Sequence, residues 1–145
     1  FITLIFLSFM TKAGEVVLNE EEQISLVTPS LYMLSDPTQK QTITQILAAK
    51  SRFKPANIDN PNFGFGGDTL WFQFPITNNT LENTWFFELS YAQNDRVNGY
   101  LVKDDLVIDK FVSGKRDFSS AFRIPTFKMS LEPGESFTLY VEVAA

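Results

Sequence analysis

The sequence predicts an all-β fold, an antiparallel β-sandwich or jelly roll with one short helix. Three observations lead to this prediction. Hydrophobic and polar residues alternate from residue 69 onward, turn signals separate the alternating runs at fairly regular spacing, and only one segment has helical periodicity. A chain of 145 residues has room for one domain with a single core, and its 15 Phe residues would make that core strongly aromatic.

The alternating runs define the strands of the expected sheets. The pattern is clearest in residues 70–77 and 85–91, and we interpret the polar segment 78–83 between them as a hairpin connection. Further strands are expected at residues 15–19, 24–34, 97–102, 106–112, 122–131 and 137–143. Asp104 and Asp105 separate two of these runs, and we expect them to form a solvated turn, because adjacent residues of an extended chain point to opposite faces.

A helix start is indicated at Thr42. Thr42 and Gln45 have the spacing of a capping box, in which each side chain binds a backbone amide that the helix itself leaves without a partner. Apolar residues follow at helical spacing, so we expect a helix over about residues 43–50. Pro55 and Pro61 then predict a loop before the sheet begins.

The N-terminal segment predicts export. Residues 1–10 form an uncharged apolar run, and small residues at positions suited to signal-peptidase cleavage follow it. We therefore divide the chain into a truncated signal peptide at residues 1–13 and a β-sandwich domain at residues 14–145 that is incomplete at its C-terminus. The alternative interpretation of the apolar run is a buried β-strand.

Composition narrows the possible functions. The chain has no His and no Cys, which removes the usual nucleophile–base systems, zinc ligands and thiol chemistry. A net charge of -5 would repel phosphate backbones, so nucleic acid is not an expected partner. We expect no enzyme activity, no cofactor and no metal; a glycoside-active enzyme would need two carboxylates facing each other across a cleft, and no such pair is indicated.

Two further features have simple structural interpretations. The glycine-rich segment 63–68 leads into a strand-like run rather than a helix, so it predicts tight backbone bends before the sheet and not a phosphate site. Asp59, Asn60 and Asp68 are possible oxygen ligands for a structural calcium ion, but they lack the spacing of an EF-hand.

The order of motifs along most of the chain is similar to that of a known family. The matching segments are residues 31–37, 67–74, 85–91, 95–101 and 133–141, together with Asn78, Gly114 and Phe118. This pattern resembles the type 2 extracellular sensor domain of bacterial seven-transmembrane receptors with diverse intracellular signalling modules. The chain departs from the family where an Arg-rich connection follows Phe118, since only Arg123 clearly remains there.

The resemblance implies a periplasmic ligand-sensing domain with a jelly-roll fold similar to carbohydrate-binding modules. Its partners would be a carbohydrate or other small molecule and, through membrane helices downstream of this fragment, a bacterial membrane. The cytoplasmic side would carry the signalling output. The alternative is a secreted structural or adhesive β-sandwich without a small-molecule ligand.

Five residues are candidates for ligand contact. A carbohydrate site needs exposed aromatic rings flanked by polar groups, and Trp71, Tyr100 and Tyr140 lie on predicted strands where they could supply such rings. Arg116 and Arg123 could bind a carboxylate or a sugar hydroxyl through their guanidinium groups. The competing interpretations are core packing for the rings and surface ion pairs for the arginines.

Overall fold

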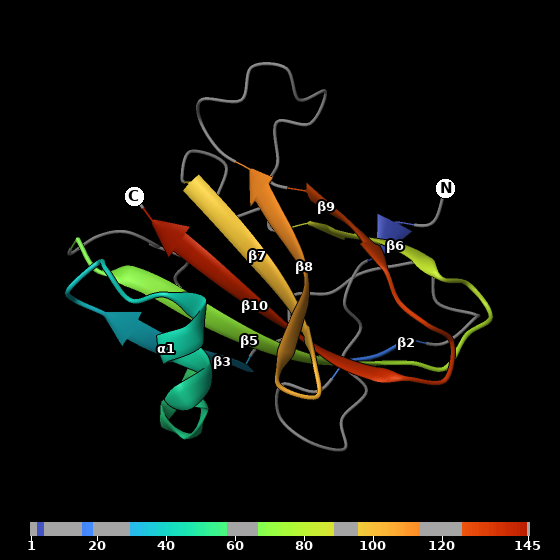
Figure 1. Ribbon diagram of the computed structural model, residues 1–145, viewed down its shortest axis with the longest axis horizontal. Coiled ribbons are helices and arrows are strands. Elements are labelled where there is room, and N and C mark those ends of the chain that lie inside the picture. Colours follow the sequence, from blue (N-terminus) through green and yellow to red (C-terminus); the bar gives the residue numbers. More distant parts are fainter. Residues whose placement is uncertain are drawn as a thin grey trace.

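Two facing β-sheets and one short helix make up the fold. Figure 1 shows the computed structural model, which describes residues 3–4, 16–18, 30–57, 67–88, 96–113 and 126–144. Most neighbouring strands are antiparallel, which confirms the predicted β-sandwich. None of the helices in these ranges is long and apolar enough to cross a membrane.

The larger sheet contains seven strands and carries most of the chain. Its order is β4 (Lys54–Asn57), β3 (Ser30–Asp36), β5 (Thr69–Asn78), β10 (Ser136–Ala144), β7 (Arg96–Lys103) and β8 (Leu106–Ser113). The seventh strand, β2 (Val16–Leu18), pairs in parallel with the end of β5. β5, β10 and β7 lie side by side through the middle of the molecule (Figure 1), so residues on these three strands have neighbours on both sides.

The smaller sheet contains β1 (Thr3–Leu4), β6 (Thr84–Glu88) and β9 (Thr126–Ser130). β6 and β9 are antiparallel, whereas the two residues of β1 lie parallel to β6. Two residues of the apolar N-terminal run therefore lie beside a strand. The signal peptide at residues 1–13 stays a prediction.

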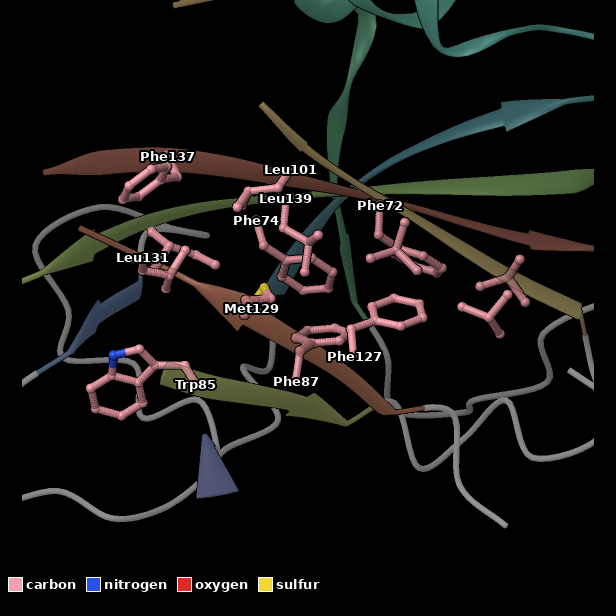
Figure 2. Close-up of a cluster of buried hydrophobic side chains, with 14 residues drawn as sticks. Phe72, Phe74, Trp85, Phe87, Leu101, Phe127, Met129, Leu131, Phe137 and Leu139 are labelled. Carbon is pink, nitrogen blue, oxygen red and sulfur yellow. The ribbon is translucent and has the colours of Figure 1, made fainter. Parts of the chain in front are cut away.

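The main core lies between the two sheets and is aromatic, as its Phe content predicts. Phe72, Phe74 and Leu139 of the larger sheet face Phe87 and Phe127 of the smaller one, as Figure 2 shows. The Phe74 and Phe87 ring centroids are 5.2 Å apart, and those of Phe87 and Phe127 are 5.9 Å apart. Each fully buried side chain of this size stabilises the fold by roughly 1.5–3 kcal/mol, so this interface holds the sheets together.

A second, smaller core lies on the opposite face of the larger sheet, where α1 (Ile43–Ala48) covers it. Ile46 of α1 packs there with Phe53, Trp71 and Tyr140. The predicted alternation along β5 is therefore correct. Phe72 and Phe74 face the other sheet, and Trp71 faces the helix.

The capping box at the start of α1 is also confirmed. The Gln45 amide donates to Thr42 Oγ1 at 3.4 Å, and the Thr42 amide donates to Gln45 Oε1 at 2.9 Å. The α-helix ends two residues before the predicted position, and a 3₁₀ turn, η1 (Lys50–Arg52), follows it. This turn brings Lys50 to the edge of the pocket described below.

Two sequence-based expectations are wrong. Residues 78–83 do not form a hairpin, because they lead from β5 in the larger sheet to β6 in the smaller one. Both strands still bury one face in the same core, so alternation alone cannot tell a hairpin from a crossing between sheets. Where a loop was expected around Pro55, the chain forms β4. This strand lies at the edge of the sheet, where a residue without an N–H is tolerated.

Asp36 ends β3 and holds the connection to α1. Its carboxylate is buried and accepts hydrogen bonds from the Thr38 amide and hydroxyl, at 2.9 and 2.6 Å, and from the Gln41 amide at 3.0 Å. Burial raises the pKa of this carboxyl, but the hydrogen bonds from Thr38 and the nearby backbone amides outweigh burial, and the pKa lies below its usual 3.8.

This lowered pKa predicts a loss of stability in acid. Because the folded state favours the ionised carboxyl, the stabilisation is present above the unfolded pKa and is lost as the pH falls through the folded pKa. Between about pH 5 and about pH 3, the free energy of unfolding in urea should therefore fall more steeply for the natural protein than for Asp36→Asn. Equal slopes for the two proteins would contradict this assignment.

Candidate functional site

A pocket of about 410 Å³ lies beside η1 on the face of the larger sheet that carries α1. Its walls come from the ends of β5, β7 and β10, from the β7–β8 turn and from Lys50. The volume is within the range of roughly 300–1,000 Å³ that is usual for small-molecule sites. Polar and charged groups line much of this pocket, which makes it the candidate functional site.

The floor of the pocket, the part that β5 and β10 form, contains hydroxyl and amide groups beside apolar residues such as Pro75. Gln73 of β5 and Tyr140 of β10 are paired in register, and Gln73 Nε2 donates to Tyr140 Oη at 3.0 Å. Four residues further along each strand, the hydroxyls of Thr77 and Ser136 share a hydrogen bond of 2.9 Å. These pairs exist because residues opposite each other on antiparallel strands project to the same face.

Tyr140 is both buried and part of the pocket wall. Only 3% of the residue is exposed, and burial raises the pKa of its phenol despite the hydrogen bond from Gln73. The hydroxyl therefore keeps its proton at neutral pH. Because its oxygen already accepts from Gln73, that proton can be donated to a bound molecule.

The rim of the pocket is formed by charged residues. Lys50 Nζ lies 2.8 Å from Asp105 Oδ1, joining η1 to the β7–β8 turn. Lys103, at the end of β7, pairs with Glu135, the residue before β10. The Asp105 hydrogen bond and its charge raise the pKa of Lys50. Both pairs are partly or largely exposed, so water screens their charges and neither pair contributes much to stability.

Asp104 and Asp105 form the two-residue turn between β7 and β8. Their φ angles are 51° and 61°, and two positive φ values in succession define a type I′ turn, whose twist matches that of the strands it joins. Both residues are exposed, which confirms the predicted solvated turn. The turn thus places two carboxylates at the pocket.

The structure places the three predicted aromatic rings on one face of the larger sheet but exposes them differently. Trp71 is 0% exposed, lies under α1, and stacks on Tyr100 with ring centroids 5.8 Å apart. Tyr100 is half-buried, and burial, followed by the charge of Glu142, raises the pKa of its phenol. Of the three, only Tyr140 lines the pocket. Contact of these rings with a ligand stays a prediction.

The two predicted arginines, Arg116 and Arg123, lie outside the described residues, as do Asp59 and Asn60 of the possible calcium site. Asp68 accepts a hydrogen bond of 2.7 Å from Ser35 Oγ. Within the described ranges, no three acidic residues gather as a metal site would require. Gly67, at the end of the glycine-rich segment, has a φ of 78°, in agreement with the bends expected there.

Sequence reasoning missed Gln73, Lys50 and Lys103. The position of Gln73 was available from the alternation along β5, because a polar residue between Phe72 and Phe74 must face away from the main core. The two lysines carried no such signal. Lys50 and its partner Asp105 are far apart in the sequence and meet only when η1 folds against the β7–β8 turn.

The architecture is that of a β-sandwich domain with a polar pocket on one outer face of its larger sheet. A family model described as 7TMR-DISM extracellular 2 matches residues 28–145, so the chain belongs to this family of extracellular domains of seven-transmembrane receptors. It is therefore an extracytoplasmic sensor domain of a transmembrane receptor, and the family is not a family of enzymes.

Comparison with solved structures finds a similarity to a β-glucuronidase of Faecalibacterium prausnitzii. The TM-score is 0.43 at 12% sequence identity, and the match covers 79% of this chain and 20% of the glucuronidase chain. This chain thus spans about a fifth of the length of that enzyme. Comparison with curated proteins finds none that matches.

Proposed function

We propose that this domain senses a small hydroxyl-rich molecule such as a carbohydrate, and that the molecule binds in the pocket beside η1. The observation that carries the proposal is the hydrogen bond from Gln73 to Tyr140 on the pocket floor. It orients a neutral phenol so that its proton faces away from its own partner. A sugar hydroxyl is a suitable acceptor for that proton.

The other floor groups support the same class of ligand. Thr77 and Ser136 hold each other through a single hydrogen bond, which leaves each hydroxyl further capacity to donate or accept. Hydroxyls at fixed spacing on adjacent strands suit a ligand that itself presents several hydroxyls. The floor strands also belong to the central part of the larger sheet, so the site is held on rigid elements.

The proposal is tested with Tyr140→Phe, which keeps the buried ring and removes the hydroxyl. Against a panel of neutral mono- and oligosaccharides, measured by isothermal calorimetry, we expect binding to weaken about two- to tenfold, the equivalent of one hydrogen bond. Tyr32→Phe is the matched control, because Tyr32 packs on the same face of the sheet but does not line the pocket. Unchanged binding by Tyr140→Phe would show that the saccharide does not bind in this pocket.

The burial of Trp71 and Tyr140 favours a second candidate, in which the domain has a structural or adhesive role without a small-molecule ligand. In that case the aromatic residues of this face serve only to hold α1 on the sheet. A saccharide panel that produces neither heat of binding nor a shift in Tm would support this second role.

A further inference from the structure

The hydroxyl groups on the pocket floor do not determine whether the ligand is charged. The charged residues around the pocket indicate which charge fits best. Two ammonium groups and two carboxylates line the pocket, those of Lys50, Lys103, Asp104 and Asp105, and a third carboxylate, that of Glu135, pairs with Lys103. Each of the two lysines already has a carboxylate partner. The cations at the rim are therefore neutralised from within the protein.

Asp104 differs from the other four groups. It lines the pocket and is exposed, and its carboxylate makes no hydrogen bond or ion pair with any described residue. Its backbone is fixed by the type I′ turn, so the carboxylate stands on a rigid hairpin rather than on a flexible loop. The pocket therefore has an acceptor-only, negatively charged group that no residue in the described part of the chain pairs with, and such a group can bind a cation.

We propose that the pocket selects a ligand that carries an ammonium group beside its hydroxyls, such as an amino sugar, with Asp104 as the group that binds the ammonium. This inference rests on the proposed function, since it concerns the same pocket. The hydroxyls of such a ligand match the floor at Tyr140 and Gln73. Its positive charge matches the carboxylate at the rim.

An anionic ligand fits the same groups less well. To reach Lys50, its carboxylate would have to displace Asp105, which would leave Asp104, Asp105 and the ligand as three negative charges at one rim. The chain as a whole has a net charge of -5, which adds a further unfavourable potential for an anion. A neutral ligand is not repelled by these carboxylates, but it forms no ion pair with Asp104.

Three probes with one ring scaffold separate these cases: glucosamine, glucose and glucuronate carry a positive, a neutral and a negative charge. At low ionic strength we expect glucosamine to bind about three- to fivefold more tightly than glucose, and glucuronate to bind most weakly. Added salt should reduce the differences, because the charges at the rim are exposed. Equal affinities, or tightest binding of glucuronate, would overturn the inference.

Asp104→Asn tests the residue itself. Asn tolerates positive φ as well as Asp does, so the turn is retained while the charge is removed. The preference for glucosamine over glucose should vanish in this variant. Asp109→Asn is the matched control, because it removes the same charge from an exposed position on β8 that does not line the pocket.

The outcomes distinguish the inference from the proposed function on which it rests. A preference that disappears in Asp104→Asn and persists in Asp109→Asn supports the inference. A preference that persists in Asp104→Asn, or disappears in both variants, shows that Asp104 does not bind the ammonium group. If none of the three probes binds the natural protein, the proposed hydroxyl-binding function itself fails.

Discussion

Gly99→Ala is expected to destabilise the domain by about 1–2.5 kcal/mol, although alanine is ordinarily the better residue in a strand. Gly99 lies on β7, on the face that meets the smaller sheet. A Cβ at this position would lie 2.6 Å from Phe127 Cε2, 2.9 Å from Phe127 Cδ2 and 3.2 Å from Phe111 Cδ2. Overpacking of this kind costs about 1–3 kcal/mol.

Two opposing effects decide whether Gly99→Ala raises or lowers the free energy of unfolding. Alanine restricts the unfolded chain more than glycine does, which alone would stabilise the protein by about 0.4–1 kcal/mol. The clash is larger, because Phe127 cannot simply move away. Its ring stacks on Phe111 at 5.2 Å and on Phe87 at 5.9 Å, within the main core. Glycine at position 99 leaves the space that the Phe127 ring occupies beside β7.

The experiment is a double-mutant cycle with Phe127→Leu, in which urea unfolding gives the free energy of each variant. Phe127→Leu should itself be destabilising, because it leaves a cavity. In that background the added cost of Gly99→Ala should fall below about 1 kcal/mol, since the two ring atoms nearest to the new methyl group belong to Phe127 and are gone. An equal cost of Gly99→Ala in both backgrounds would show that the strain arises elsewhere.

The sequence predicted well those elements in which the local pattern of hydrophobic and polar residues matches the burial of the same side chains in the fold. Alternation along β5 assigned Phe72 and Phe74 to one face and Trp71 to the other, and the structure buries them in two different cores. The Thr42–Gln45 capping box was recognisable because it depends only on residues three positions apart.

The errors have a common physical cause, which is that strand pairing is not encoded locally. Residues 78–83 look like a hairpin connection, yet β6 pairs with β9 and β5 pairs with β10, strands that are distant in sequence. Pro55 suggested a loop, but an edge strand has one side without a neighbour, and a missing N–H costs nothing there.

The candidate site was predicted only in part for the same reason. Tyr140 was a candidate from its residue type, and it does line the pocket. The pocket itself arises from the meeting of η1, the β7–β8 turn and the ends of three strands. The sequence shows Lys50 and Asp105 as ordinary surface residues, and only the fold brings them within 2.8 Å.

Asn78 lies where the chain leaves β5 for the smaller sheet, and its replacement is expected to have the largest effect on stability of the changes considered. The residue is 0% exposed. Its Nδ2 donates to the carbonyls of Glu82, at 2.8 Å, and Leu131, at 3.0 Å, while its Oδ1 accepts from the amide and hydroxyl of Thr80. The side chain thus ties the connection between the sheets to the segment after β9.

The backbone of Asn78 strengthens the same junction. Its N–H donates to the carbonyl of Glu135 at 3.0 Å, and its carbonyl accepts from Gly134 at 2.7 Å. An aspartate at this position would be almost isosteric but would have no amide donors. One carboxylate oxygen would then face two carbonyl oxygens in a site without access to water.

Asn78→Asp is therefore expected to reduce the free energy of unfolding by about 3–5 kcal/mol at neutral pH, the cost of an uncompensated buried charge. The loss should be smaller near about pH 4, because protonation removes the charge and supplies one O–H donor in place of the two lost N–H donors. Asn79→Asp, an exposed neighbour with the same change, should cost less than about 0.5 kcal/mol. Urea unfolding of both variants at the two pH values measures these effects, and equal losses for the two variants would show that the buried hydrogen bonds of Asn78 do not hold the junction.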